Sequence, residues 1–315
     1  MREFVESPGS RFRDHLDPKV ADWLVPFQAD AAFDVAFLGA PLSKTSISHS
    51  AAFRLPDAVR SAFAAMSPYN VNHRLDLADK LGFADMGNVR MHVTDLARCH
   101  DNIEAAAAAY WQDYRKPLVV LGGDHSITAP SVMGFAKATS KTIGIVHFDA
   151  HHDVRNLEDG GRTYGTPFRT LLESGTIAGE NLVQIGLRDY ANAAAYHRYV
   201  LEHGATVYTA RDVHRHGMAD LVEEALERAA DRTDAVYVSF DLDVLDQSLV
   251  PGVPAPGPAG MTVWDAVDAL EWLGQQSMVE AMDVVCGDPL QDYRDLTTRV
   301  AALMVMSFLT GLALR

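Results

Sequence analysis

Short runs of hydrophobic residues alternate along the chain with longer segments in which hydrophobic and polar residues recur at helical spacing. This alternation is typical of a parallel sheet with helices on both faces, so the pattern predicts an α/β fold. The predicted strands are residues 34–38, 82–84, 118–121, 142–148, 182–186, 206–208, 236–240 and 280–285. The predicted helices are residues 56–66, 99–114, 191–204, 218–231 and 262–276.

Two segments have patterns of their own. The hydrophobic C-terminal stretch 301–315 is too short for a membrane span, so we expect a buried closing helix. The Pro- and Gly-rich stretch 250–260 directly follows a predicted strand. It fits either a domain linker or an active-site loop, and the loop is favoured because ligands bind beyond the carboxyl ends of strands in open α/β sheets. We expect one domain over residues 1–315, with residues 1–30 as an N-terminal extension.

The charge and the cysteine content narrow the class of protein. Among 315 residues, 27 are Lys or Arg and 42 are Asp or Glu, which gives a formal net charge of -15. This excess of acid argues against a nucleic-acid or anionic-membrane partner, since either would require a basic face. Only Cys99 and Cys286 are present, and the N-terminal residues lack the hydrophobic core of a secretory signal. We therefore expect a soluble, cytoplasmic protein.

Polar clusters follow three of the predicted strands. They read "GGDHS" at 122–126, "DAHHD" at 149–153 and "DLDVLD" at 241–246. Because the carboxyl ends of parallel strands lie along one edge of the sheet, these clusters are expected to converge. The residues expected to form one site are His125, Asp149, His151, Asp153, Asp241 and Asp243.

Two imidazoles and four carboxylates suit a borderline first-row ion such as Mn²⁺. Six side chains exceed what one catalytic ion with an open position needs, and they suit two ions that share bridging carboxylates. Each cluster alone is also compatible with an ordinary turn, but the three together favour a metal site. His147 lies within a strand pattern and is expected to be packed or hydrogen-bonded, and His152 is expected to point away from its neighbours, so neither is assigned as a ligand.

Together, these motifs resemble the arginase–agmatinase–formimidoylglutamase family, the ureohydrolases, and within it most closely the formimidoylglutamases. The likeness extends over most of the chain. The segments that carry it are "GAPLSKTSISHS" (39–50), "GGDHSIT", "HFDAHHDVRNLEDGG", "GTPFR" (165–169), "DLDVLDQSLVPG", "AMDVVCGDP" and "YRDLTTRVAA".

The resemblance implies a three-layer α/β sandwich around a mostly parallel, about eight-stranded sheet, a homo-oligomer, and two Mn²⁺ ions per chain. It also sorts the ligands. One ion would be held by His125, Asp149, Asp153 and Asp241, and the other by Asp149, His151, Asp241 and Asp243. Asp149 and Asp241 would then be the two bridges.

The resemblance further implies a hydrolysis of a carbon–nitrogen bond in a linear amidine. Two cations lower the pKa of a bridging water, and the resulting hydroxide attacks the amidine carbon. Asp153 is the candidate to carry the proton to the leaving nitrogen. For N-formimidoyl-L-glutamate, the products would be L-glutamate and formamide.

The chain departs from the family pattern at two positions. Many ureohydrolases carry a proton-transferring His just before the "GTPFR"-like stretch, where this chain has Tyr164. The family Glu that pairs with a cationic substrate is replaced by Cys286 in "DVVCGDP". A neutral thiol cannot provide the charge-assisted contact of a carboxylate. Cys286 is interpreted as a pocket wall for a less basic substrate, as a nucleophile, or as the mark of an inactive paralogue, and the pocket wall is favoured.

Two arginines are candidates for binding a substrate carboxylate, because a guanidinium fits that group. They are Arg155, just past the ligands, and Arg169 in "GTPFR", and a structural ion pair with residues 156–161 is the alternative for each. Two other functions remain open. One is a ureohydrolase of a small guanidino acid that releases urea, and the other is a catalytically silent, metal-stabilised subunit of such an enzyme.

Overall fold

A computed structural model describes residue 5 and residues 13–315, so residues 1–4 and 6–12 of the expected N-terminal extension lie outside the described residues. Within the described part, one sheet has nine strands in the order β1-β5-β2-β6-β11-β10-β7-β8-β9, and every neighbouring pair is parallel. The strands are β1 (Leu24–Pro26), β2 (Val35–Ala40), β5 (Phe83–Asn88), β6 (Leu118–Gly122), β7 (Ile143–Phe148), β8 (Leu182–Leu187), β9 (Thr206–Thr209), β10 (Ala235–Asp241) and β11 (Val279–Val285).

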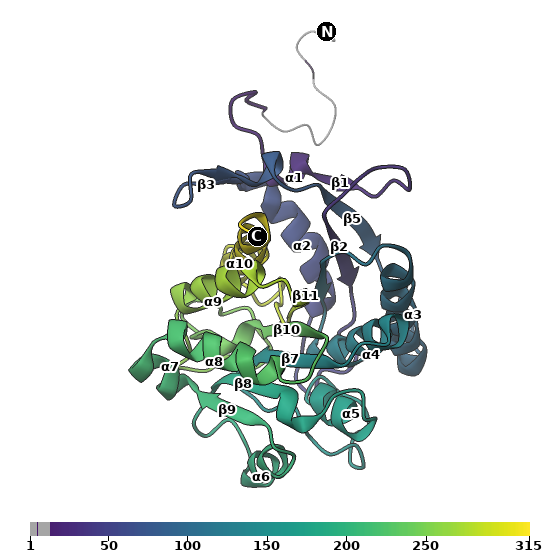
Figure 1. The fold of residues 1–315 in the computed structure, drawn as a ribbon, viewed down its shortest axis with the longest axis vertical. Coiled ribbons are helices and arrows are strands. Elements are labelled where there is room, and N and C mark those ends of the chain that lie inside the picture. Colours follow the sequence, from purple (N-terminus) through teal and green to yellow (C-terminus); the bar gives the residue numbers. More distant parts are fainter. Residues whose placement is uncertain (1–4, 6–12) are drawn as a thin grey trace.

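Helices cover both faces of this sheet (Figure 1). One face packs against α2 (Leu55–Ala62), α8 (Met218–Ala230), α9 (Val263–Gln275) and α10 (Leu296–Ala313). The other packs against α3 (Leu96–Asp113), α4 (Thr128–Thr139), α5 (Pro167–Glu173) and α6 (Ala194–Glu202). The remaining elements include α1 (Val20–Trp23), α7 (Ala210–His216) and a small antiparallel pair, β3 (Tyr69–Asn70) with β4 (Leu75–Asp76).

The central strands are hydrophobic along their whole length because they are buried on both faces. In β6, Val119 and Leu121 belong to the core beneath α2, α8, α9 and α10, whereas Leu118 and Val120 belong to the core beneath α3 and α4. Successive side chains of a strand point to opposite faces, so a strand with a helical layer on each side needs a continuous hydrophobic run.

The predicted α/β sandwich is confirmed, and each of the eight predicted strands is present within a few residues of its expected bounds. The ninth strand, β1, comes from the stretch expected to be an N-terminal extension and pairs with β5. The closing helix is also confirmed as α10. It is long and apolar enough to cross a membrane, but 72% of its apolar window is buried inside the protein, as in a core helix.

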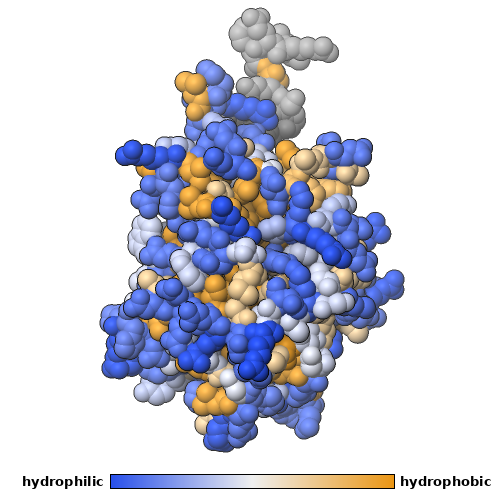
Figure 2. All heavy atoms as spheres, viewed as in Figure 1, coloured by the Kyte–Doolittle hydropathy of each residue, from blue (hydrophilic) through white to orange (hydrophobic). Residues whose placement is uncertain are grey.

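The strand order brings β6, β11, β10 and β7 together in the middle of the sheet. Their carboxyl ends are therefore neighbours, and each leads into a segment singled out in the sequence. The face of the molecule seen in Figure 2 is largely hydrophilic, with hydrophobic residues in separate patches. Ligands bind beyond the carboxyl ends of strands in such sheets, so this edge is the expected position of a functional site.

Candidate metal centre

His125 is held in place by the turn that follows β6. The short 3-10 helix η5 (His125–Ile127) is capped by Asp124, whose Oδ1 accepts hydrogen bonds from Ser126 N at 3.1 Å and Ser126 Oγ at 2.6 Å. An Asp at this position satisfies a free N–H group at the start of the helix. The turn places the imidazole of His125 at the sheet edge, with none of it exposed.

Three carboxylate oxygens surround Nδ1 of His125. It lies 2.9 Å from Asp153 Oδ2, 3.1 Å from Asp149 Oδ2 and 3.2 Å from Asp241 Oδ2. Nevertheless, this buried nitrogen makes no hydrogen bond of acceptable geometry. Four ligand atoms that converge without bonding one another have the arrangement expected around a cation, and their chemistry fits Mn²⁺. The residues present thus fit the metal that the fold implies.

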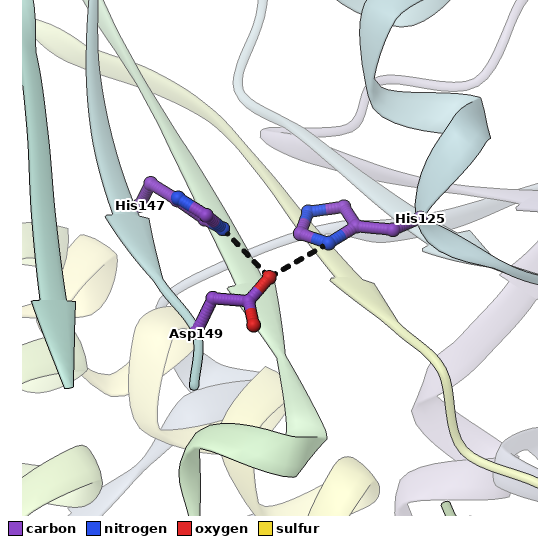
Figure 3. A group of neighbouring side chains, drawn as sticks. All are labelled: His125, His147 and Asp149. Carbon is purple, nitrogen blue, oxygen red and sulfur yellow. Dashed lines mark hydrogen bonds and ion pairs between the residues drawn. The ribbon is translucent and has the colours of Figure 1, made fainter. Parts of the chain in front are cut away.

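A second group of ligand atoms lies beside the first. Nδ1 of His151 is 3.2 Å from Asp149 Oδ1 and 3.1 Å from Asp243 Oδ2. Asp149 therefore directs Oδ2 toward the His125 group and Oδ1 toward the His151 group. Figure 3 shows the contact between His125 and Asp149, in which His125 and His147 both point at the same oxygen of Asp149. All six predicted ligands are brought together at this edge of the sheet.

The protein groups at the centre are strongly perturbed by one another. Burial and the neighbouring charges of Asp243 and Asp149 raise the pKa of Asp241 to about 8. Burial and Asp149 raise the pKa of Asp153 to about 6. Burial alone would lower the pKa of His151, but Asp243 and Asp149 raise it to about 12. Crowded carboxylates of this kind favour bound positive charge, whether protons or cations.

Buried polar residues inside the strands orient the ligands, and these were not singled out in the sequence. Nε2 of His125 contacts Ser239 Oγ at 2.9 Å, and that hydroxyl donates to Asp283 Oδ1 at 2.8 Å. Thr128 and Tyr237 donate to the other oxygen of Asp283. Such partners fix the ring orientation of a metal-binding histidine. A lone polar residue within an apolar strand was the available signal for Ser239 and Asp283.

The two histidines that were left out of the ligand set are buried and hydrogen-bonded, which was the expectation for His147. Nε2 of His147 contacts Asp149 Oδ2 at 2.9 Å, and Nδ1 of His152 contacts Gln184 Oε1 at 2.7 Å. His147 is closer to the cluster than expected, because its ring reaches one oxygen of a predicted ligand.

A cavity of about 110 Å³ opens beside these ligands. Asp153, Arg155 and Tyr164 line it together with His151. The exposed side chain of Arg155 passes over Gly165, where an added Cβ would lie 2.8 Å from Arg155 Cδ. Tyr164 is half-buried, and its hydroxyl is 3.4 Å from Ser48 Oγ. Three of the predicted catalytic and substrate-binding residues therefore face one space.

A larger cavity of about 850 Å³ shares His151 with the small one. Residues 255–260 of the Pro- and Gly-rich stretch form part of its wall. The stretch therefore shares a cavity with one of the predicted ligands, an arrangement that favours the active-site-loop interpretation.

Cys286 lies beside His125 and Asp241 and is not among the residues that line the small cavity. Its Sγ is within 4.8 Å of the ligand atoms of His125 and Asp241, and only 1% of the residue is exposed. Burial and the nearby Asp241 raise the pKa of the thiol well above its usual value. Its backbone is in the left-handed region, with φ of 68°, and its N–H donates to Gly123 O. A protonated, buried thiol is not suited to act as a nucleophile.

Arg169 is occupied by structural contacts. Its Nε donates to Val154 O at 3.1 Å, and it pairs with Glu173 at 3.2 Å. The guanidinium carbon also lies 3.4 Å from the centre of the Tyr199 ring. These contacts support the structural interpretation of Arg169, although the paired acid is not one of those in residues 156–161.

A His- and Asp-lined centre at the carboxyl edge of a parallel sheet is suited to bind the divalent ions that a metal-dependent hydrolase uses. The model of the arginase family matches residues 33–311, and the chain belongs to this family. A formimidoylglutamase from Halalkalibacterium halodurans is 43% identical over 309 residues, which are 98% of this chain and 96% of that protein.

Solved structures agree with this assignment. The crystal structure of formimidoylglutamase from Bacillus subtilis matches with a TM-score of 0.95 and 36% identity, over 99% of this chain and 97% of that one. The Trypanosoma cruzi formiminoglutamase with Mn²⁺ matches with a TM-score of 0.86 and 26% identity, over 95% of this chain and 99% of that one. The chain is thus an arginase-family hydrolase.

Proposed function

We propose that this hydrolase is a formimidoylglutamase, which converts N-formimidoyl-L-glutamate and water into L-glutamate and formamide. The observation that carries the two-metal hydrolysis in this proposal is the division of Asp149 between two groups of ligand atoms, one around His125 and one around His151. The near full-length similarity to formimidoylglutamases supports this substrate over a guanidino acid.

The centre would hold two Mn²⁺ ions, the metal named for the Trypanosoma cruzi relative. We assign one ion to His125, Asp149, Asp153 and Asp241, and the other to Asp149, His151, Asp241 and Asp243. When bound, a pair of divalent ions supplies the nucleophile by lowering the pKa of water to near neutrality. The protein supplies the shape, the dry surroundings and the proton carrier.

Asp153 is proposed as that carrier. It lies at the boundary between the ligand cluster and the small cavity, with 9% of the residue exposed. In the metal-free protein, burial and Asp149 raise the pKa of its carboxyl group to about 6. Because Asp153 borders both the ligand cluster and the cavity, its carboxylate can accept a proton from the nucleophile and deliver it to the leaving nitrogen.

The glutamate part of the substrate requires a cationic anchor, and Arg155 is the proposed one. Its side chain lines the small cavity together with Asp153, and Arg155 is absent from the arginine ion pairs formed among the described residues. A guanidinium binds a carboxylate through two parallel hydrogen bonds. Tyr164 faces the same cavity and is proposed to contact the formimidoyl end, with Cys286 as a neutral wall deeper in the cluster.

The proposal is tested by incubating the Mn²⁺-loaded protein with a panel of linear amidines and guanidino acids. Formamide, urea and ammonia are measured separately, and the chelated protein serves as the control. Formamide from N-formimidoyl-L-glutamate is the expected product. Urea from a guanidino acid would instead establish the ureohydrolase alternative, and no product from any substrate would establish the silent subunit.

We further propose that the chain is a single domain that acts in the cytoplasm, in histidine degradation, as a homo-oligomer. Support for self-association comes from exposed hydrophobic side chains around a groove of about 450 Å³ between the β3–β4 pair and helices α9 and α10. Trp264 is 72% exposed and Tyr69 is 47% exposed at this groove. Measurement of the mass in solution tests this part of the proposal.

A further inference from the structure

A continuous chain of hydrogen bonds connects the protein surface to Asp149. The exposed His197 on α6 contacts His152, with 3.1 Å between Nδ1 and Nε2. His152 Nδ1 contacts Gln184 Oε1 at 2.7 Å, and Gln184 Nε2 contacts His147 Nδ1 at 3.0 Å. His147 Nε2 then reaches Asp149 Oδ2 at 2.9 Å. The three middle residues are fully or almost fully buried.

The orientation of the Gln184 amide is determined by a backbone carbonyl. Its Nε2 lies 2.9 Å from the carbonyl oxygen of His152. A carbonyl oxygen only accepts hydrogen bonds, so the amide atom that faces it must be the nitrogen. The second hydrogen of the same NH₂ group then points at His147 Nδ1.

This orientation determines the tautomers of two histidines. Because Gln184 donates to His147 Nδ1, that nitrogen must be an acceptor, and the ring proton must be on Nε2, where it donates to Asp149. Because Gln184 Oε1 only accepts, His152 must carry its proton on Nδ1 and accept from His197 at Nε2. Every bond in the chain therefore has a fixed direction, which runs from the surface to Asp149.

The same amide prevents the chain from transmitting a proton. A side-chain amide has its donor and its acceptor on different atoms, so it cannot accept a proton on one side and release one on the other as an imidazole does. The chain is consequently suited to fix orientation. Its effect falls on Asp149 Oδ2, the oxygen that also faces His125 (Figure 3).

We propose that Gln184 is a positioning residue for the metal centre, because it keeps His147 as an Nε2–H donor to Asp149. This inference rests on the proposed metal-binding function. The hydrogen bond from His147 fixes the plane of the Asp149 carboxylate, so that Oδ1 remains directed at the His151 group. Without it, the backbone N–H of His151, which donates to Oδ1 at 2.6 Å, still orients the carboxylate, but Asp149 is held less firmly between the two groups of ligand atoms.

The test is a titration of metal-free protein with Mn²⁺ in three variants. Gln184→Met removes the donor at nearly constant volume. Gln184→Glu presents only acceptors, which favours the opposite His147 tautomer and places a bare nitrogen against Asp149. We expect Mn²⁺ affinity to fall roughly tenfold to a hundredfold in Gln184→Glu and less in Gln184→Met, the range found for partners of metal ligands.

Asn181→Asp is the matched control, since Asn181 is a buried amide just before β8 that donates to the carbonyl of Asp231 at 2.7 Å. It should lower the melting temperature of the metal-free protein but leave Mn²⁺ affinity unchanged. The inference is overturned if Gln184→Met binds both ions within about twofold of the wild type, or if Asn181→Asp weakens binding as much as Gln184→Glu. If Gln184→Glu does not fold, Gln184→Met decides. A wild type that binds no Mn²⁺ would overturn the proposed function instead.

Discussion

The side chain of Asp149 contacts both groups of ligand atoms. Its two oxygens face the two groups of ligand atoms, and the neighbouring His151 N–H donates to Oδ1 at 2.6 Å. His151, in contrast, contacts only the second group. The loss of Asp149 is therefore expected to affect both ions, whereas the loss of His151 should affect one.

Asp149→Asn and His151→Ala test this difference. After loading with Mn²⁺ and removal of free metal, Asp149→Asn should retain well under one ion per chain, because a neutral amide is a poor bridge. His151→Ala should retain about one, from the roughly two of an intact pair. Asp241→Asn should behave as Asp149→Asn does. If Asp241→Asn retains full metal content and activity, Asp241 is not a bridge.

The ionisation of the ligands predicts how stability depends on pH. The pKa values of Asp153, Asp241 and His151 are raised to about 6, about 8 and about 12, from ordinary values of 3.8 and 6.5. The folded metal-free chain therefore binds more protons than the unfolded chain around neutral pH, and its stability falls as pH rises. Mn²⁺ takes the place of these protons, so it should stabilise the protein more at high pH.

Melting temperatures near pH 6 and pH 8, the pKa values of Asp153 and Asp241, provide the measurement. The chelated protein should melt lower near pH 8, and the increase on adding Mn²⁺ should be larger there. A chelated protein that becomes more stable as the pH rises over this range would contradict the electrostatic account of the centre.

Cys286 predicts a preference against strongly basic substrates. A charge-assisted hydrogen bond contributes about 1.5–3 kcal/mol, which corresponds to roughly a tenfold to hundredfold change in affinity. Cys286→Glu should therefore raise kcat/KM for a cationic amidine, provided that Tyr164 leaves room, and the wild type should act poorly on arginine or agmatine. An efficient wild type on either guanidine, with no gain in the variant, would show that Cys286 is not at the amidinium position.

The strands and the amphipathic helices were predictable because their patterns depend on local periodicity. The elements that the sequence did not predict, such as α4 and β1, lack a clear periodicity of hydrophobic residues. Helix α4 is buried on most sides and contains Pro130 and Gly134, so its hydrophobic residues do not form a single stripe. Strand β1 has three residues, of which only Leu24 is buried, and so short an edge strand leaves almost no alternation to detect.

The helices stabilise the fold by packing away from the metal centre. A substitution in a helical layer should therefore lower stability without changing metal binding. Trp111 of α3 stacks on Phe135 of α4 with 4.0 Å between the ring centres, and only 1% of Trp111 is exposed. Trp111→Ala should lower the free energy of unfolding by about 3–5 kcal/mol while Mn²⁺ stoichiometry is unchanged.

Val93→Ala is the control, because 85% of Val93 is exposed and it lies outside the groove proposed for self-association. It should change the free energy of unfolding by no more than about 0.5 kcal/mol. Urea denaturation of both variants measures the difference. If Trp111→Ala instead loses bound metal while its stability is unchanged, the division between packing layers and metal centre is wrong.

In the whole molecule, the parallel sheet converts three distant sequence motifs into one centre. The six proposed ligands were predictable because each motif follows a hydrophobic strand, and parallel strands end at one edge. The hydrogen bonds that orient these ligands could not be predicted from the sequence, because they depend on which strands are neighbours in the sheet. His125 and Ser239, for example, are 114 residues apart and meet only because β6, β11 and β10 are consecutive in the sheet.

The number of divalent ions bound per chain tests the central claim most directly. Elemental analysis of Mn²⁺-loaded protein, after removal of free metal, should give about two ions per chain. Chelation should remove both ions and lower the melting temperature, because ligands that bind only the folded state stabilise it. A content that remains near zero after loading, with no shift in melting temperature, would contradict the account.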